Sequence, residues 1–267
     1  MEERWFEFTG SGECLACRDF GGHGSPVLLL HGLAGHAGEW AETASWLTWR
    51  ARVYALDQRG HGRSERRPGD VSRASHVADV IALVESVGSP GAILIGQSLG
   101  GQTALLTAAR RPDLVKGLVV AEATAGEPTP EVSAEVRALL EAWPVPFPSR
   151  GAALDFFGGE GLAAHAWADG LEEGPDGLRP RFDIDVLVSI LEAAETRSYW
   201  DEWASIRCPT LVVRGEHGTL RADEASRMTD SSNSRLVEIP GSGHDVHLED
   251  PGAWRAAIEG FLDARPR

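Results

Sequence analysis

The stretch Ile93-Leu94-Ile95-Gly96-Gln97-Ser98-Leu99-Gly100-Gly101 decides how the rest of the chain is interpreted. An apolar run ends at a glycine, a serine stands in the middle of a G-x-S-x-G pattern, and a helix-compatible run follows. This order predicts a strand, a sharp turn and a helix, an arrangement known as a nucleophile elbow. Because the backbone of such a turn is strained, we expect that Gly96 and Gly100 have no room for a side chain.

Ser98 is therefore the candidate nucleophile, since a neutral hydroxyl becomes nucleophilic when a base lies beside it. The helix that starts at Ser98 would also direct its first amide groups to the place where negative charge develops on oxygen. A glycine-rich turn with a surface serine would show the same pattern. The order of strand and then helix favours the nucleophile.

On both sides of this stretch, apolar runs alternate with helical stripes. The alternation predicts an α/β fold: a mostly parallel, twisted sheet with helices on both faces. A last helix is expected to begin with Asp250 as N-cap and Pro251 in its first turn. The expected strands are a short antiparallel pair within residues 5–20, followed by residues 27–30, 52–56, 92–95, 117–121, 210–214 and 235–239, so that 117–121 is the sixth strand and 210–214 the seventh. The helices between them cover residues 39–49, 75–87, 98–110 and 221–229.

The strand pattern breaks near Gly126-Glu127-Pro128-Thr129-Pro130, and from there to about residue 205 we find helical stripes and no apolar strand run. We expect a core of residues 1–124 and 206–267, with a helical cap (lid) of residues 125–205 inserted after the sixth strand. Its aromatic side chains are expected to form an apolar ceiling over the site, although ordinary helix packing would explain any one of them. The candidates for the substrate pocket are Trp143, Trp167, Trp200 and Trp203.

The chain resembles the α/β-hydrolase superfamily, and specifically its members with a helical cap. Four segments carry the resemblance, in the order of the family and over nearly the whole chain. They are His31-Gly32, Asp57-Gln58-Arg59-Gly60-His61-Gly62-Arg63-Ser64, the elbow Gly96-Gln97-Ser98-Leu99-Gly100-Gly101, and Gly243-His244. The resemblance implies the fold and hydrolytic chemistry, and says little about the substrate.

The resemblance also implies roles for particular residues. His244 would be the general base, because its loop follows the last strand and the expected order is serine, acid, histidine. The backbone N–H groups of Leu33 and Leu99 would form the oxyanion hole. Asp57 and Arg59 are expected to stabilise their turn as a pair. His31 and His61 are expected to be structural, and a solvated surface position is expected for His23, His36, His76, His165, His217 and His247.

The acid departs from the family pattern. Most members carry an aspartate three residues after the glycine that ends the seventh strand; from Gly215 that position is Gly218, which has no side chain. Glu122, at the carboxyl end of the sixth strand, is the expected substitute, as in some haloalkane dehalogenases. The alternative for Glu122 is a structural carboxylate at the root of the cap. The rival acid is Glu216, and weaker candidates are Asp223 and Asp245.

These residues predict a serine hydrolase that cleaves a carboxylic ester, lactone or thioester of a small apolar substrate through an acyl-enzyme. One alternative is hydrolysis of a carbon–carbon bond by the same triad, and another is cofactor-free oxygen chemistry or perhydrolysis. A third is a non-catalytic small-molecule receptor on the same fold. Dehalogenase and epoxide hydrolase chemistry are disfavoured, because those enzymes attack with an aspartate and this elbow offers Ser98.

The net charge of −15 argues against a nucleic-acid or anionic membrane partner, and no apolar run is long enough to span a bilayer. Residues 1–5 lack the features of a secretion signal. Cys14 and Cys17 lie three apart in an expected strand and so point to opposite faces; with Cys208 they are expected to be reduced and structural. We expect a cytoplasmic monomer or homodimer that acts on a small molecule, with no metal and no cofactor.

Overall fold

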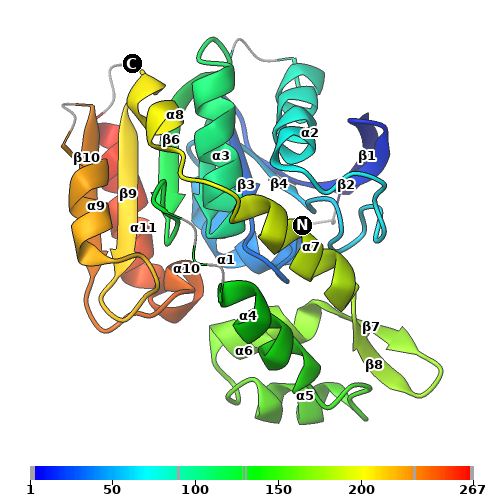
Figure 1. The fold of residues 1–267 in the computed structure, drawn as a ribbon. Helices are drawn as coiled ribbons and strands as arrows, with labels where there is room; N and C mark the ends of the chain where they lie inside the picture. The colour runs from blue at the N-terminus through cyan, green and yellow to red at the C-terminus, as the bar shows by residue number, and fades with distance from the viewer. Residues whose placement is uncertain (1–3, 89–90, 128, 130, 231–232, 265–267) are drawn as a thin grey trace.

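The computed structural model describes residues 4–88, 91–127, 129, 131–230 and 233–264. Residues 1–3, and Pro128 and Pro130 of the expected boundary, lie outside these ranges. Within the described chain, eight strands form one sheet in the order β1-β2-β4-β3-β5-β6-β9-β10 (Figure 1). The strands from β4 to β10 in this order run parallel, and β1 and β2 are antiparallel at one edge. The predicted α/β architecture is confirmed.

The elements of the sheet and its covering helices follow the predicted alternation closely. The strands are β1 (Arg4–Gly10), β2 (Glu13–Gly21), β3 (Pro26–Leu30), β4 (Arg52–Leu56), β5 (Ala92–Gln97), β6 (Val115–Ala121), β9 (Thr210–Gly215) and β10 (Ser234–Ile239). The helices around them are η1 (Ala37–Trp40), α1 (Ala41–Leu47), α2 (Arg73–Ser86), α3 (Leu99–Arg110), α9 (Ala222–Met228), α10 (Val246–Glu249) and α11 (Pro251–Asp263). As predicted, Asp250 caps α11, accepting from the Ala253 N–H at 2.9 Å.

The central strands are buried on both faces, which explains their continuous apolar sequence. In β3, Leu28 and Leu30 pack into the core with α2 and α3, whereas Val27 and Leu29 pack on the other face with α1 and α11. Burying each of these side chains contributes about 1.5–3 kcal/mol. The parallel strands end at one rim of the sheet, and the functional residues lie at that rim.

Most of the segment between β6 and β9 lies beyond this rim, whereas its last helix lies beside α3 (Figure 1). It contains α4 (Val132–Glu141), α5 (Arg150–Phe156), α6 (Leu162–Asp169), β7 (Leu171–Gly174), β8 (Gly177–Pro180), α7 (Ile184–Ala194) and α8 (Trp200–Ser205). The segment has no apolar strand run, as predicted, but it is not purely helical, because β7 and β8 form a hairpin. Neither strand carries an apolar run, and the hairpin is held by backbone hydrogen bonds between Phe147 and Leu178.

The last helix of this segment packs with the core and not with the other inserted helices. Trp203 of α8 belongs to the buried cluster that includes Leu105 of α3 and Met228 of α9. The limits 125 and 205 of the inserted cap stay a prediction. By its packing, α8 lies with the core and not with the other inserted helices.

Two expectations about polar residues of the core are corrected by the structure. Arg59 pairs with Asp79, at 2.6 and 2.7 Å, and not with Asp57. The carboxylate of Asp57 instead accepts from the backbone N–H groups of Ala37 and Arg63, at 2.6 and 2.8 Å. Both side chains still stabilise the turn after β4, but each does so through a partner remote in sequence.

Three of the histidines expected at the surface are buried, namely His36, His76 and His247. Each ring has a polar partner inside the protein: the Ala166 carbonyl for His36, the Ser72 carbonyl for His76 and the Glu39 carboxylate for His247. Those contacts compensate the loss of hydration, and sequence position alone does not predict them.

The faces of the cysteines and the lengths of the helices can be read from the structure. Cys14 is exposed and Cys17 is buried on the same strand β2, so the two side chains face opposite sides of the sheet, as predicted. No helix in the described part of the chain combines the length and the apolar character that crossing a bilayer needs.

Candidate active site

Ser98 lies at the turn between β5 and α3, with φ 51° and ψ −119°. Such a conformation costs about 1–3 kcal/mol for a residue with a side chain, and tight packing around it maintains it. A Cβ atom on Gly96 would lie 2.2 Å from the Gly100 carbonyl oxygen, and one on Gly100 would lie 2.2 Å from the Leu30 carbonyl oxygen. The expectation that neither glycine has room for a side chain is confirmed.

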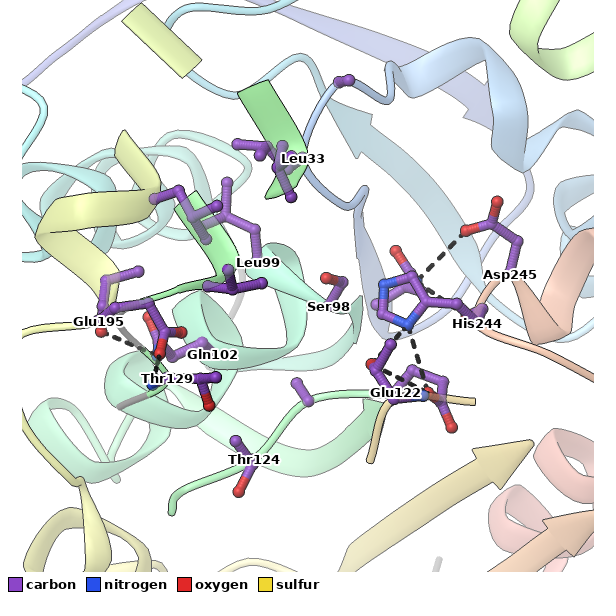
Figure 2. A pocket seen from close by; sticks show the side chains of 18 of the residues that line it. Leu33, Ser98, Leu99, Gln102, Glu122, Thr124, Thr129, Glu195, His244 and Asp245 are labelled. Carbon is purple, nitrogen blue, oxygen red and sulfur yellow. Dashed lines mark hydrogen bonds and ion pairs between the residues drawn. The ribbon is translucent and has the colours of Figure 1, made fainter. Parts of the chain in front are cut away.

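His244 lies in the loop between β10 and α10, and its ring is about one-third exposed. Its Nδ1 atom is 3.2 Å from Glu122 Oε2 and 2.8 Å from Thr219 Oγ1. Figure 2 shows the Ser98 side chain next to the other side of the ring, and both residues line one cavity. The ring therefore has an acid at one nitrogen and faces the serine with the other.

Glu122 directly follows β6, has φ 50°, and is 2% exposed. Its Oε1 accepts from the Gly215 N–H at 2.7 Å, and its Oε2 accepts from the N–H groups of Thr219 and Leu220 at 2.6 and 3.2 Å. Burial alone would raise the pKa of this carboxyl, but the hydrogen bonds from His244, Gly215 and Leu220 outweigh burial and lower the pKa. Glu122 is therefore an anion at neutral pH.

Gly218, the position where most of the family carries an aspartate, lies against this carboxylate. A Cβ atom on Gly218 would lie 2.2 Å from each carboxylate oxygen of Glu122. Strands β6 and β9 are neighbours in the sheet, so their ends open into the same space. The carboxylate that follows β6 thus occupies the volume that a side chain at 218 would fill.

The carboxylates of the other candidate acids have partners other than the His244 ring. Glu216 is exposed and accepts from the Gly241 N–H at 2.8 Å. Asp223 forms an exposed ion pair with Arg221. Asp245 lines the cavity, and burial raises its pKa, but its hydrogen bond is with Gln97 Nε2 at 3.4 Å. Among the described residues, Glu122 is the carboxylate that contacts the His244 ring.

The two backbone amides proposed for the oxyanion hole lie on the loop after β3 and at the start of α3. Leu99 is the first residue of α3, so its N–H precedes the hydrogen bonds of the helix. Leu33 follows Gly32, where a Cβ atom would lie 3.3 Å from Ser98 Cβ and 2.2 Å from Gln97 Oε1. The absence of a side chain at Gly32 therefore allows the Leu33 loop to approach the serine.

Two buried histidine rings hold this loop. His31 Nε2 accepts from the Gln58 N–H at 3.0 Å, and His61 Nε2 accepts from the Ala34 N–H at 3.2 Å. Burial lowers the pKa of His31 and lowers that of His61 to about 3. Both rings are neutral at neutral pH, which their acceptor role requires.

A cavity of about 1190 Å³ extends from Ser98 and His244 into the inserted segment. Trp143, Trp167 and Trp200 line it, as do apolar side chains of α4 such as Val136. Trp143 packs edge-to-face on Trp167 with ring centroids 5.9 Å apart.

The prediction that Trp203 lines the substrate pocket is wrong, because it is not among the residues that line this cavity. It is 9% exposed, and its Nε1 donates to the Met228 carbonyl at 3.0 Å inside the core. Ordinary helix packing, the alternative given for these aromatic side chains, describes Trp203, because it belongs to the buried core cluster.

Two residues of the site are missed by sequence reasoning. Thr219 lies between Glu122 and His244, with its Oγ1 3.3 Å from Glu122 Oε2. Gln97 Nε2 donates to the His244 carbonyl at 3.0 Å and so fixes the loop that carries the imidazole. The adjacency of Gln97 to Ser98 is a signal for the second residue. No pattern in the sequence indicates Thr219, since its role depends on Glu122 being its neighbour in space.

The fold and the site together define a class. A family model described as "Alpha/beta hydrolase family" matches residues 27–258, so the chain belongs to the alpha/beta hydrolase family and is a hydrolase by class. An esterase from Mycobacterium tuberculosis is 32% identical over 262 residues, covering 92% of this chain and 85% of the relative.

Other relatives agree with this class. A 2-(acetamidomethylene)succinate hydrolase from Mesorhizobium japonicum is 27% identical over 251 residues, covering 91% of this chain and 90% of the relative. The crystal structure of an E-2-(acetamidomethylene)succinate hydrolase matches with a TM-score of 0.88 at 23% identity, covering 98% of this chain and 100% of that chain, which shows the shared fold. A marine microorganism esterase matches with a TM-score of 0.77 at 27% identity, covering 93% and 99%.

Proposed function

We propose that this protein is a serine hydrolase that cleaves a carboxylic ester, lactone or thioester through an acyl-enzyme. The observation that carries the proposal is the hydrogen bond from the His244 ring to the buried carboxylate of Glu122, with Ser98 on the other side of the ring. A base held by an acid beside an activated serine is the arrangement that acyl transfer requires.

The proposed reaction has two halves. His244 Nε2 accepts the proton of the Ser98 hydroxyl as its oxygen bonds to the substrate carbonyl carbon, and the N–H groups of Leu33 and Leu99 stabilise the oxyanion. His244 then gives the proton to the leaving alcohol or thiol as its bond to carbon breaks. In the second half, His244 deprotonates a water that attacks the acyl-enzyme, and Ser98 leaves with the proton. Glu122 holds the ring and stabilises its charged form throughout.

The cavity supports a neutral, apolar substrate under an inserted cap. Its lining includes apolar side chains such as Val136, Leu140 and Trp143, and also the carboxylates of Glu127, Glu195 and Glu224. The two arginines of the lining are engaged, since Arg221 pairs with Asp223 and Arg227 lies 3.7 Å from the Trp200 ring centre. Six carboxylates line the cavity and outnumber its two arginines, so a substrate carboxylate would meet mainly like charge there, which is unfavourable. We therefore propose that this protein acts on a different substrate from its relative that is named for a succinate.

A cytoplasmic location and a monomeric or homodimeric state without a metal or other cofactor belong to the same proposal. The free thiols of Cys14 and Cys17 support the location, because reducing compartments keep thiols unpaired.

The test combines labelling and turnover. We expect a fluorophosphonate probe to label Ser98, and p-nitrophenyl butyrate and octanoate to be hydrolysed with a higher kcat/KM than the p-nitrophenyl monoester of succinate. A lactone and a thioester extend the panel, and Ser98→Ala is the control without a nucleophile. Absence of labelling, or equal turnover by Ser98→Ala, would refute the serine hydrolase and favour a non-catalytic receptor.

A further inference from the structure

Two arginine side chains are buried in the core, and they differ in their partners. Arg59 is fully buried and meets the carboxylate of Asp79 through Nε and Nη2, at 2.6 and 2.7 Å. Arg73 is 7% exposed, and no carboxylate of the described residues pairs with it. Its Nη2 donates to the Leu99 carbonyl at 3.3 Å and to Thr103 Oγ1, while its Nε and Nη1 are buried without a hydrogen-bond partner.

An unpaired, partly satisfied guanidinium destabilises the folded state, because its charge is removed from water without a counter-ion. Burial lowers the pKa of Arg73 to about 10, so the group is still protonated at neutral pH. A buried group of this kind needs an explanation outside stability, and such exceptions concentrate at functional sites.

The location of Arg73 supplies one. The Leu99 carbonyl to which it donates belongs to the residue after Ser98, at the start of α3. Thr103 Oγ1 lies 3.1 Å from Gln58 Oε1, and Gln58 Nε2 donates to the His31 carbonyl at 2.6 Å. One chain of hydrogen bonds therefore runs from the guanidinium to both backbone segments that carry the proposed oxyanion donors, the segment at Leu99 and the segment that follows His31.

We propose that Arg73 is a positioning residue for the oxyanion hole: it holds the start of α3 against the loop after β3 and places a desolvated positive charge behind the amide groups that receive the oxyanion. The inference rests on the proposed serine hydrolase. The positive charge of Arg73 adds to the partial positive charge of the α3 N-terminus. Preorganised donors and dipoles of this kind stabilise the transition state more than they stabilise the bound substrate. The buried guanidinium thus lowers the stability of the folded state and makes the chemical step faster.

The test compares Arg73→Met and Arg73→Lys with Arg59→Met as the matched control, using p-nitrophenyl butyrate turnover and thermal unfolding. Arg73→Met removes the charge and the donors at similar length. We expect kcat to fall about 10- to 100-fold, since small misplacements and lost oxyanion stabilisation cost this much, with KM within about twofold and a Tm equal to or above that of the wild type. Arg73→Lys keeps the charge and a donor, so it should recover most of the lost kcat.

The control has the opposite thermal effect. Arg59→Met leaves the Asp79 carboxylate buried without a partner, so its Tm should fall. An Arg73→Met enzyme with wild-type kcat would overturn the inference and leave the proposed function intact. So would a kcat that falls together with Tm in both Arg73 variants, because that pattern is purely structural. A wild-type protein that neither hydrolyses the ester nor labels at Ser98 would instead refute the proposed function, and the inference with it.

Discussion

The rim of the sheet and the inserted segment above it differ in how their residues are held. At the rim, Ser98 and Glu122 follow directly after strands, and His244 lies in the loop after β10. Backbone atoms or hydrogen bonds fix each one, as Gly100 does for Ser98 and Gly215 for Glu122. In the insertion, short helices and a hairpin are joined by aromatic contacts, such as Trp143 on Phe157 with centroids 4.9 Å apart. The rim is thus held through the backbone and the insertion through side-chain packing, so we expect substitutions at the rim to affect the chemistry and those in the insertion to affect substrate choice.

The largest effect should come from the rim. Glu122→Gln keeps the shape but removes the charge that orients and stabilises the His244 ring, so we expect kcat to fall about 10³- to 10⁴-fold, as for the corresponding change in serine proteases. Turnover of p-nitrophenyl butyrate measures it. Glu216→Gln is the matched control and should stay within about threefold, and equal small losses in both variants would reject Glu122 as the acid.

A transfer of the acid between neighbouring strands tests whether the shared volume matters. Glu122→Gly suits the positive φ of that position, and Gly218→Asp supplies a carboxylate in the space that this change vacates. We expect the double variant to exceed Glu122→Gly alone at least about tenfold in kcat/KM. Gly218→Asp alone should be destabilised, because two carboxylates would compete for one site. A double variant no better than Glu122→Gly would show that the acid works from one strand end alone.

A pair of glycine substitutions compares the tolerance of the two regions directly. Gly100→Ala places a Cβ atom 2.2 Å from the Leu30 carbonyl oxygen, so we expect a loss of about 3 kcal/mol or more in unfolding free energy. Gly158→Ala in the insertion meets no atom within 4 Å, but its φ is 106°, so the expected loss is about 1–2 kcal/mol of backbone strain. Urea titrations measure both, and similar losses would remove the distinction between the regions.

Substrate choice should respond to the insertion without loss of the fold. Trp143→Ala removes apolar surface from the cavity wall, so KM for p-nitrophenyl octanoate should rise about tenfold, equivalent to about 1.4 kcal/mol of lost binding. The kcat for p-nitrophenyl acetate should stay within about twofold. A matched fall in kcat for both esters would place Trp143 in the catalytic geometry instead.

The smallest expected effect is a pH dependence of the unfolding free energy, caused by Glu122 at the rim of the sheet. The pKa of Glu122 is lower in the folded protein than its ordinary value, so its charged form stabilises the fold above an unfolded pKa of about 4.3. That stabilisation is lost as the pH falls through the lower folded pKa. The difference in unfolding free energy between wild type and Glu122→Gln should therefore shrink from pH 6 to pH 3. The loss of unfolding free energy caused by Gly158→Ala, which involves no titrating group, should stay constant over this pH range. If the difference between wild type and Glu122→Gln did not vary with pH, it would contradict the lowered pKa of Glu122.

The sequence predicts the regions unequally for physical reasons. Strands such as β3 and β5 are buried on both faces, and the elbow has a short motif of its own, so pattern and motif predict them well. The hairpin of β7 and β8 carries little apolar sequence, and its partner Phe147 is distant in the chain. The burial of His36 depends on the Ala166 carbonyl of α6, and the place of Trp203 depends on α3. These are tertiary contacts that no local period encodes.

The exchange between residues 122 and 218 has a consequence for how related chains are sorted. A search that requires an aspartate after the seventh core strand would discard this sequence as a degenerate, inactive copy, although an acidic group fills the same volume from the adjacent strand. Glycine at one strand end paired with glutamate at the next is visible in an alignment without any structure. Family members with this combination of glycine and glutamate would form a subgroup. A test of the aspartate position alone would wrongly class the members of that subgroup as inactive.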